Sequence, residues 1–149
     1  MTHRIFFSLI CIAGFLTSCQ LADDDETNAQ NVAEKWAAAY FHCDFHDAAK
    51  YCTPESQRWL RFAASNTTQH NLDLLSAKPV NIDIEDCYAA NSDTLYIVRL
   101  SVENFLKPTA LGDTTTQADG LFDLTLVKRD GEWLVKMEGL PRSEKQSHD

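Results

Sequence analysis

The chain has 149 residues, a formal net charge of -9 and a charged fraction of 23%. This length suits one folded domain with short flanking segments. The surplus of Asp and Glu repels nucleic acid phosphates and anionic lipid headgroups, so both are excluded as direct partners of the folded part.

The first 18 residues have the pattern of a leader peptide. Arg4 provides a positive charge, and the stretch 5–16 that follows is almost entirely apolar. A helix needs about 20 apolar residues to span a membrane, so this stretch is too short for a permanent membrane helix. We predict that residues 1–18 are a signal peptide destined for cleavage. An ordinary secretory signal or a buried helix are the alternatives.

Residues Leu16, Thr17, Ser18 and Cys19 resemble the lipobox of bacterial lipoproteins, in which a branched apolar residue and two small residues precede a cysteine. The resemblance implies that Cys19 is lipidated and becomes the first residue of the mature chain. A thiolate is a nucleophile that can take a diacylglyceryl group as a thioether. More than one acyl chain gives durable anchoring. We therefore expect contact with the membrane through this lipid anchor alone.

Four acidic residues, Asp23, Asp24, Asp25 and Glu26, follow the expected anchor. They resemble the export signal that one group of Gram-negative bacteria places directly after the lipidated cysteine. The resemblance implies an outer-membrane lipoprotein displayed on the cell surface, with a periplasm-facing position as the alternative. The run can also be interpreted as a solvated linker that its charges keep extended. We assign residues 19–30 to a lipidated acidic tether.

Apolar residues recur with helical spacing in the first half of the predicted domain, which we place at residues 31–140. The expected buried stripes are Val32, Trp36, Ala39 and Tyr40, then Phe45, Ala48, Ala49 and Cys52, then Trp59, Leu60 and Ala63, and finally Leu72 with Leu75. Asp44 is the expected N-cap of the second helix, and the pair Thr53 and Pro54 is a start signal for the third.

After Pro79 the period of the apolar residues changes from 3.6 to 2, which predicts strands. The positions expected to face inward are Val80, Ile82, Ile84, Tyr96, Val98, Leu100, Val102, Phe122, Leu124, Leu126, Trp133, Val135 and Met137. Asn91, Ser92 and Asp93 predict a turn, and Asp130 with Gly131 predicts a tight hairpin. Helices followed by an antiparallel sheet of about four strands form an α+β order. Residues 141–149 are expected to be a polar tail.

This layout resembles the nuclear transport factor 2-like superfamily, also called cystatin-like. The segments that carry the resemblance are VAEKWAAAYFHCDFHDAAKYCTPES at 32–56 and LTLVKRDGEWLVKM at 124–137. Within that superfamily, the chain resembles small bacterial lipoproteins of unassigned function. The resemblance implies a cone, in which N-terminal helices pack on the concave side of a curved antiparallel sheet.

The interior of the expected cone decides between binding and catalysis. Candidate cavity-lining residues are Trp36, Tyr40, Trp59, Tyr96 and Trp133. Acid–base catalysis needs a titratable group facing the substrate, and among the inward strand positions only Tyr96 carries a polar atom. We therefore name no catalytic residue and no cofactor. We expect a non-catalytic binding or protein-interaction module, and the alternative is an isomerase-type or hydratase-type enzyme that uses the cavity.

His42, Asp44 and His46 are residue types that bind zinc. Residues two apart on a helix point in different directions, and a helix break falls between the two histidines. We therefore predict no metal site, and interpret the three residues as exposed histidines around a capping aspartate.

The outward face of the predicted sheet mixes apolar and charged positions. They are Leu95, Ile97, Val127 and Leu134 with Asp83, Glu85, Arg99, Arg129, Lys136 and Glu138. Such a mixture suits a moderate protein interface, either in a homodimer or with an envelope protein. A helix or tail that covers the face, or merely scattered surface residues, are the alternatives.

Three cysteines remain once Cys19 and the leader are set aside: Cys43, Cys52 and Cys87. Nine helical residues separate the first two by about 13 Å, too far for a disulfide. A bridge must therefore use Cys87, and Cys52–Cys87 is our candidate pair. Buried free thiols are the alternative.

Overall fold

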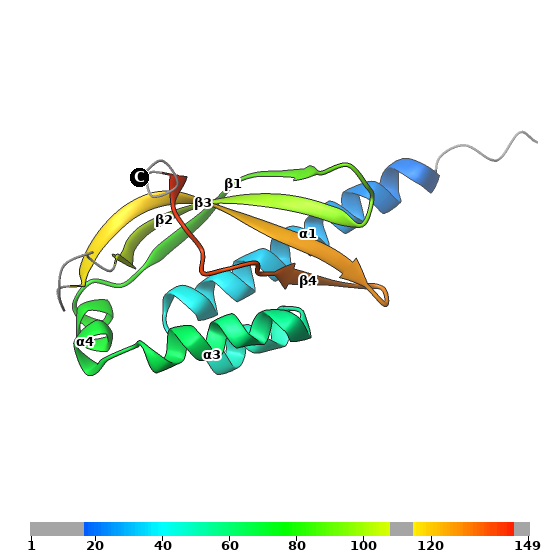
Figure 1. Cartoon of the computed structure of the whole chain (residues 1–149). Coiled ribbons are helices and arrows are strands. Elements are labelled where there is room, and N and C mark those ends of the chain that lie inside the picture. The colour runs from blue at the N-terminus through cyan, green and yellow to red at the C-terminus, as the bar shows by residue number, and fades with distance from the viewer. Residues whose placement is uncertain (1–16, 108–114, 145–149) are drawn as a thin grey trace, which may run out of the picture.

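The computed structural model describes residues 17–107 and 115–144, with side chains from residue 24 onward. In these ranges the helices come first, and a four-stranded antiparallel sheet follows in the strand order β1-β2-β3-β4. Figure 1 shows the sheet as a curved layer with the helices on one side of it. The predicted α+β fold, with N-terminal helices on a curved sheet of four strands, is confirmed. The cone of the superfamily stays a prediction.

Helix α1 (Thr17–Phe41) crosses the sheet (Figure 1). It includes residues 19–30, for which the sequence predicts a tether. Ala29 is fully buried, and it extends the stripe of Ala33, Trp36 and Ala37 by one helical turn toward the N-terminus. The domain therefore begins before residue 31. Short alanine side chains let the helix approach the sheet closely, at positions where the polar composition of the sequence predicts a linker.

The shorter helices follow as α2 (Phe45–Ala48), α3 (Gln57–Ser65) and α4 (Gln69–Ala77). Asp44 is the N-cap of α2, because its side chain accepts the N–H of Asp47. Thr53 precedes a single 3₁₀ turn, Pro54–Ser56, that leads into α3. Its hydroxyl pairs with that of Ser56, and the Ser56 hydroxyl accepts the N–H of Met137 at 2.8 Å.

The strands are β1 (Asn81–Ala89), β2 (Leu95–Lys107), β3 (Thr116–Arg129) and β4 (Glu132–Lys136). The predicted strand phases hold, since burial alternates along β2 and β4 as expected. Asp130 and Gly131 both have positive φ, 51° and 81°, which confirms the tight hairpin. Leu72 on α4 departs from its expected burial and is exposed, whereas Leu75 is buried.

The C-terminal segment packs against the sheet instead of trailing away as a polar tail. Figure 1 shows it leaving β4 and crossing β3. Ser143 is 4% exposed, and a Cβ added to Gly120 would lie 2.8 Å from the Ser143 Cβ. Glu144 then pairs with Arg99 at 2.8 Å. The predicted tail at 141–149 is therefore wrong for 141–144, while 145–149 lie outside the described residues.

The three cysteines are free thiols in the structure, so the candidate bridge Cys52–Cys87 is wrong. The backbone of Cys52 forms a parallel β-bridge with Val135 of β4, whereas Cys87 lies in β1 at the opposite edge of the sheet. Three strand spacings separate these edges by about 14 Å, and a disulfide needs Cα atoms within about 7 Å. Burial raises the pKa of both thiols to about 11.

Candidate functional site

A pocket of about 1050 Å³ opens beyond the C-terminal end of α1. Helices α2, α3 and α4, the ends of β2 and β3 that face them, and the segment 138–142 form its walls. Seven of the twenty lining residues are aromatic: Tyr40, Phe41, Phe45, Trp59, Phe62, Phe105 and Phe122. The volume is just above the range of about 300–1,000 Å³ found for small-molecule sites.

The aromatic rings of this wall are held by contacts with one another. Tyr40 stacks on Trp36 with ring centroids 4.7 Å apart and meets the edge of Phe45 at 5.6 Å. Phe122 lies 4.9 Å from Phe105 and 5.0 Å from Phe41. Such offset and edge-to-face pairs are the arrangements that aromatic quadrupoles favour. The wall is therefore preformed, which keeps the ordering cost of binding small.

A bulge in β2 turns Phe105 toward the pocket. The register with β3 shifts between Val102 and Phe105, and Asn104 in between has a φ of 60°. Asparagine tolerates this left-handed conformation because its short polar side chain bonds locally. Here the Asn104 N–H donates to Asp119 at 2.8 Å, and its amide donates to the carbonyl of Pro79 at 3.1 Å.

The polar groups of the lining are largely neutral. Burial raises the pKa of the Tyr40 hydroxyl and of the Cys43 thiol, so both stay protonated at neutral pH. Asn66, Thr67 and Asn71 add amides and a hydroxyl. The indole N–H of Trp59 is buried with no hydrogen-bond partner among the described residues. These groups suit binding and orientation more than proton transfer.

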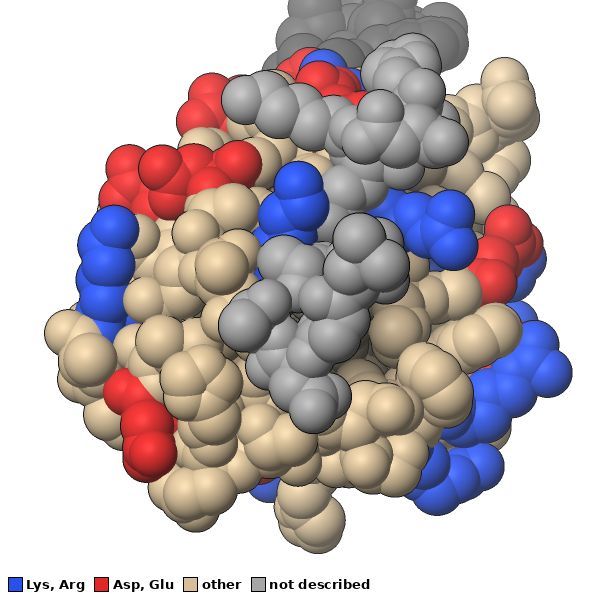
Figure 2. Space-filling view, turned by 60° about the vertical axis from the view of Figure 1, so that its left-hand side comes forward, with Lys and Arg blue, Asp and Glu red and all other residues tan. Residues whose placement is uncertain are grey.

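Three charged residues line the mouth of the pocket: Lys107, Glu138 and Arg142. Glu138 is paired with Lys136 at 3.1 Å, and its side chain is 81% exposed. Within the part of the chain that the structure describes, no carboxylate forms an ion pair with Lys107 or Arg142. Figure 2 brings the α4 end forward and shows basic and acidic side chains among many uncharged residues on this face. The described lining of the pocket itself carries two cations and one carboxylate.

The structure brings together two of the five candidate cavity residues, Tyr40 and Trp59. Trp36, Tyr96 and Trp133 lie in the hydrophobic core instead. The remaining pocket residues were missed because they come from a helix end, a bulge and a segment assigned to a tail. For Phe105, the Asn104 that precedes it in a long strand was an available signal.

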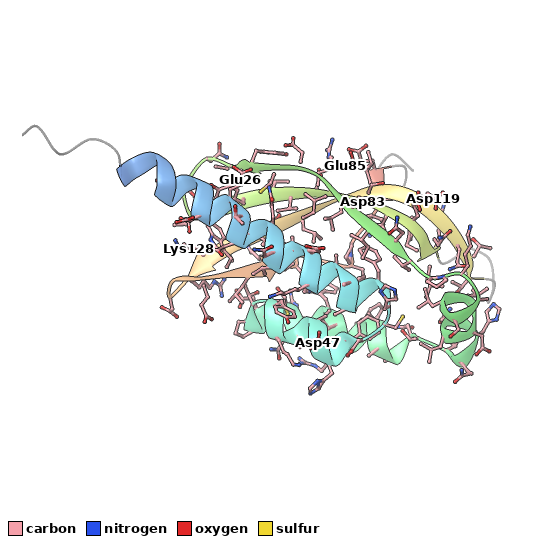
Figure 3. The ribbon with its side chains drawn as sticks, turned by 180° about the vertical axis from the view of Figure 1, so that it is seen from behind. Glu26, Asp47, Asp83, Glu85, Asp119 and Lys128 are labelled. Carbon is pink, nitrogen blue, oxygen red and sulfur yellow. The ribbon has the colours of Figure 1, made fainter. Side chains whose placement is uncertain are left out.

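A second cluster lies at the other end of α1, around Asp25. Its carboxylate accepts hydrogen bonds from Lys128 Nζ at 2.7 Å and from Trp133 Nε1 at 3.2 Å. The hydrogen bond from Lys128 holds the pKa of the Asp25 carboxyl below its ordinary value. Figure 3 shows Lys128 beside the N-terminal half of α1, which carries Glu26. We call Asp25, Lys128 and Trp133 the Asp25 clasp.

The other residues of the predicted lipidation and export signals that the structure describes lie in α1. Asp24 is exposed and Glu26 is half-buried on α1. Cys19 and Asp23 lie in the helical backbone of α1, but their side chains are outside the described part, as are residues 1–16 of the predicted leader.

The outer sheet face is partly occupied by the protein itself. Arg99 binds Asp123 through two hydrogen bonds of 2.9 and 3.0 Å, and it also pairs with Glu144. Arg129, expected on this face, reaches Glu55 of the helical layer. Asp83 and Glu85 lie on the side of the sheet away from the helices (Figure 3). The alternative of a covering tail therefore holds for the part of the face around Arg99.

Over residues 24–107 and 115–144, no group of three or more His, Cys, Asp or Glu side chains that could hold a metal ion occurs. His42 Nδ1 lies 2.7 Å from the carbonyl oxygen of Ala38, and Asp44 caps α2.

Within the described residues, no helix is long and apolar enough to cross a membrane. No protein-family model matches the chain, and a search of curated proteins finds no match either.

Proposed function

We propose that this chain is a cell-envelope lipoprotein whose folded domain is a non-catalytic binding module, with the aromatic pocket as its binding site. The observation that carries the proposal is the pocket of about 1050 Å³ with its preformed aromatic wall. Concave, mostly apolar sites with a few placed polar groups are the usual form of small-molecule sites. Phe41, Phe105 and Phe122 are buried at the inner end of this pocket, whereas Tyr40, Phe45 and Trp59 are only partly buried and Phe62 is 53% exposed.

The location of the protein is a separate part of the proposal. It depends on the resemblance of Leu16–Cys19 to a lipobox and of residues 23–26 to a surface-export signal. Outer-membrane attachment with display on the cell surface follows from both, and a periplasm-facing position follows from the lipobox alone. Cys19→Ser tests the anchor, because serine has no thiol to lipidate. We expect the variant to lose labelling by a fatty-acid probe, and retained label would contradict the assignment.

The rival is an isomerase-type or hydratase-type enzyme. Such chemistry needs an acid or base whose pKa lies near neutral pH and which faces the substrate. In the pocket, Tyr40 and Cys43 are held protonated by burial, and the carboxylate of Glu138 is paired at the exposed mouth. These features favour binding. The pocket provides an apolar surface for a ligand but no acid or base with a pKa suited to catalysis among the groups named above.

A neutral fluorescent dye, phenylnaphthylamine, tests the binding function directly, because its emission rises in apolar surroundings. The mature chain with Cys19→Ser avoids detergent, and we expect it to bind one dye molecule. Ala63→Trp places a large ring in the pocket and should abolish binding. Ala64→Trp is the matched control, since Ala64 is the exposed neighbour on α3. Equal dye binding by both tryptophan variants would show that the dye binds elsewhere.

Kinship with the nuclear transport factor 2-like superfamily is also part of this proposal. The order of helices before a curved antiparallel sheet supports it. A homodimer or an envelope partner on the outer sheet face would have to use the surface left by the C-terminal segment. The exposed Tyr88 of β1 is an apolar ring on this face, close enough to Arg99 to act on its charge.

A further inference from the structure

We propose that the ligand of the pocket is an amphipathic anion, with an apolar chain or ring system as its body and a carboxylate as its head. A long-chain fatty acid represents this chemistry. The inference rests on the proposed binding function and specifies its ligand. The supporting observation is the pair of cations at the mouth, Lys107 and Arg142, with which a purely apolar ligand would form no ion pair.

The apolar body has a continuous surface to lie on. From the inner end the wall runs along Phe122, Phe105 and Phe41 to Tyr40 and Trp59. Phe62 extends it outward and is 53% exposed, a large apolar ring left open to water at the mouth. An exposed aromatic beside a concave apolar site is typical of a surface that is covered when its ligand is present.

The head has two candidate partners from separate segments of the chain. Lys107 ends β2, and Arg142 lies in the C-terminal segment, yet both line the same pocket. Neither forms an ion pair with a carboxylate of the described residues, and Lys35, Arg58, Arg61 and Lys78 share this property. What sets Lys107 and Arg142 apart is that both line the pocket, where the one acidic group of the described lining, Glu138, is paired with Lys136. A carboxylate head therefore meets two cations there, and a guanidinium can bind it with two parallel hydrogen bonds.

The position of the pocket favours a free amphiphile over a lipid of the anchoring membrane. Residues 19–40 of α1 span about 32 Å at 1.5 Å per residue. The clasp at Asp25 ties the N-terminal part of this helix to the sheet, so the helix is a spacer and not a loose tether. With Cys19 as the anchor, the pocket is held at the far end of the domain. Its ligand then arrives through the aqueous compartment.

Competition against phenylnaphthylamine separates the ligand classes, using the mature Cys19→Ser chain. The competitors are dodecanoate, dodecanol and dodecyltrimethylammonium, which share one chain length and differ in charge. We expect dodecanoate to displace the dye at the lowest concentration and the cationic amphiphile at the highest. Lys107→Gln/Arg142→Gln should weaken dodecanoate about tenfold, the loss of a charge-assisted contact, and change dodecanol less than twofold.

The matched control is Lys35→Gln/Arg61→Gln, which removes the same charge from exposed positions outside the pocket lining. We expect it to bind dodecanoate like the unsubstituted chain. Dodecanol binding as tightly as dodecanoate, or equal effects of both double variants, would overturn the anionic head while leaving the pocket function intact. Failure to bind the dye at all would instead overturn the proposed function. If the protein bound phosphatidylglycerol vesicles and dodecanoate abolished that binding, the ligand would be a membrane lipid, and the proposal of a free amphiphile would be overturned.

Discussion

The two ends of helix α1 differ in how their charges are satisfied. At the N-terminal end, Asp25 accepts hydrogen bonds from Lys128 and Trp133, so its charge is compensated inside the domain. At the pocket end, Lys107 and Arg142 line an open, partly aromatic pocket without a carboxylate partner in the described residues. The same helix thus joins a closed end to an open one. The closed end stabilises the fold, and the open end is the one that we propose binds a ligand.

The aromatic residues make the same distinction. Trp133 is 5% exposed, meets Tyr96 edge-on at 5.0 Å and has its indole N–H satisfied by Asp25. Trp59 lines the pocket, and its indole N–H has no partner among the described residues. The indole N–H of Trp36 also has no partner among the described residues, although Trp36 is fully buried in the core, so an unmet donor alone does not mark a binding residue. Trp59 differs because it lines the pocket, where a ligand can reach it.

The largest effect is expected from Trp133→Ala. Truncating a buried tryptophan typically costs about 3–5 kcal/mol, a large part of the stability of a domain of this size. Thermal unfolding followed by circular dichroism should show a steep drop in Tm. Trp59→Ala should lower Tm less and remove most of the dye binding. If Trp59→Ala is the more destabilising of the two, the contrast between the closed and open ends is wrong.

Gly120→Ala is expected to come next. Alanine gains about 0.5–1 kcal/mol over glycine in a strand from chain entropy, but overpacking costs about 1–3 kcal/mol. The added Cβ would lie 2.8 Å from the Ser143 Cβ, so the clash dominates and displaces the C-terminal segment. Tm should fall and dye binding should weaken, since that segment forms a pocket wall. Gly139→Ala is the control for stability, because its added Cβ has nothing within 4 Å and should leave Tm unchanged.

Acid should loosen the helical layer through Glu55. Hydrogen bonds from Arg129 lower the pKa of the Glu55 carboxyl to about 2, below the ordinary value of about 4.3. A depressed pKa stabilises the fold above the unfolded-state value, and this contribution is lost as pH falls toward 2. From about pH 5 down to about pH 2, the range that spans the unfolded and folded pKa values of Glu55, Tm should fall less steeply in Glu55→Gln than in the unsubstituted chain. Glu34→Gln on the exposed side of α1 should keep the full slope.

The smallest effect is expected from Asp25→Asn, which removes the charge of the clasp. Lys128 and Asp25 are both partly exposed, so solvent screens their attraction and Tm should change little. Amide hydrogen exchange is the sensitive measurement. Exchange should accelerate over residues 24–30 of α1 and stay unchanged over 33–41, where the helix is held by Trp36 and its neighbours. Uniform protection in the variant would mean that the clasp does not hold the helix.

Local rules predicted much of this fold. The alternation in β2, β3 and β4, the Asp44 cap and the Asp130–Gly131 hairpin follow from short-range patterns that tertiary contacts do not override. The tether was misassigned because Ala29 buries little area, so its burial leaves no hydropathy signal. The 141–144 segment was missed because Ser143 packs against the bare backbone of Gly120, a contact between distant residues.

The candidate site was less predictable for a related reason. Tyr40 and Trp59 carried a helical signal, but the pocket also needs Phe105 after a bulge and Arg142 in an irregular segment. A bulge reverses the inward and outward positions that follow it, so alternation fails beyond Val102. The pairing of charges was not predictable either, because Asp25 and Lys128 are neighbours only after the helix crosses the sheet.

The most direct measurement is a titration of the ¹⁵N-labelled mature chain with dodecanoate, followed residue by residue in amide NMR spectra. We expect shifts concentrated at the open end, at Phe62, Phe105, Lys107 and Arg142. The Asp25 clasp, formed by Asp25, Lys128 and Trp133, should stay unperturbed and serves as an internal control. Shifts centred on the clasp, or none anywhere at concentrations below micelle formation, would contradict the assignment of binding to the pocket.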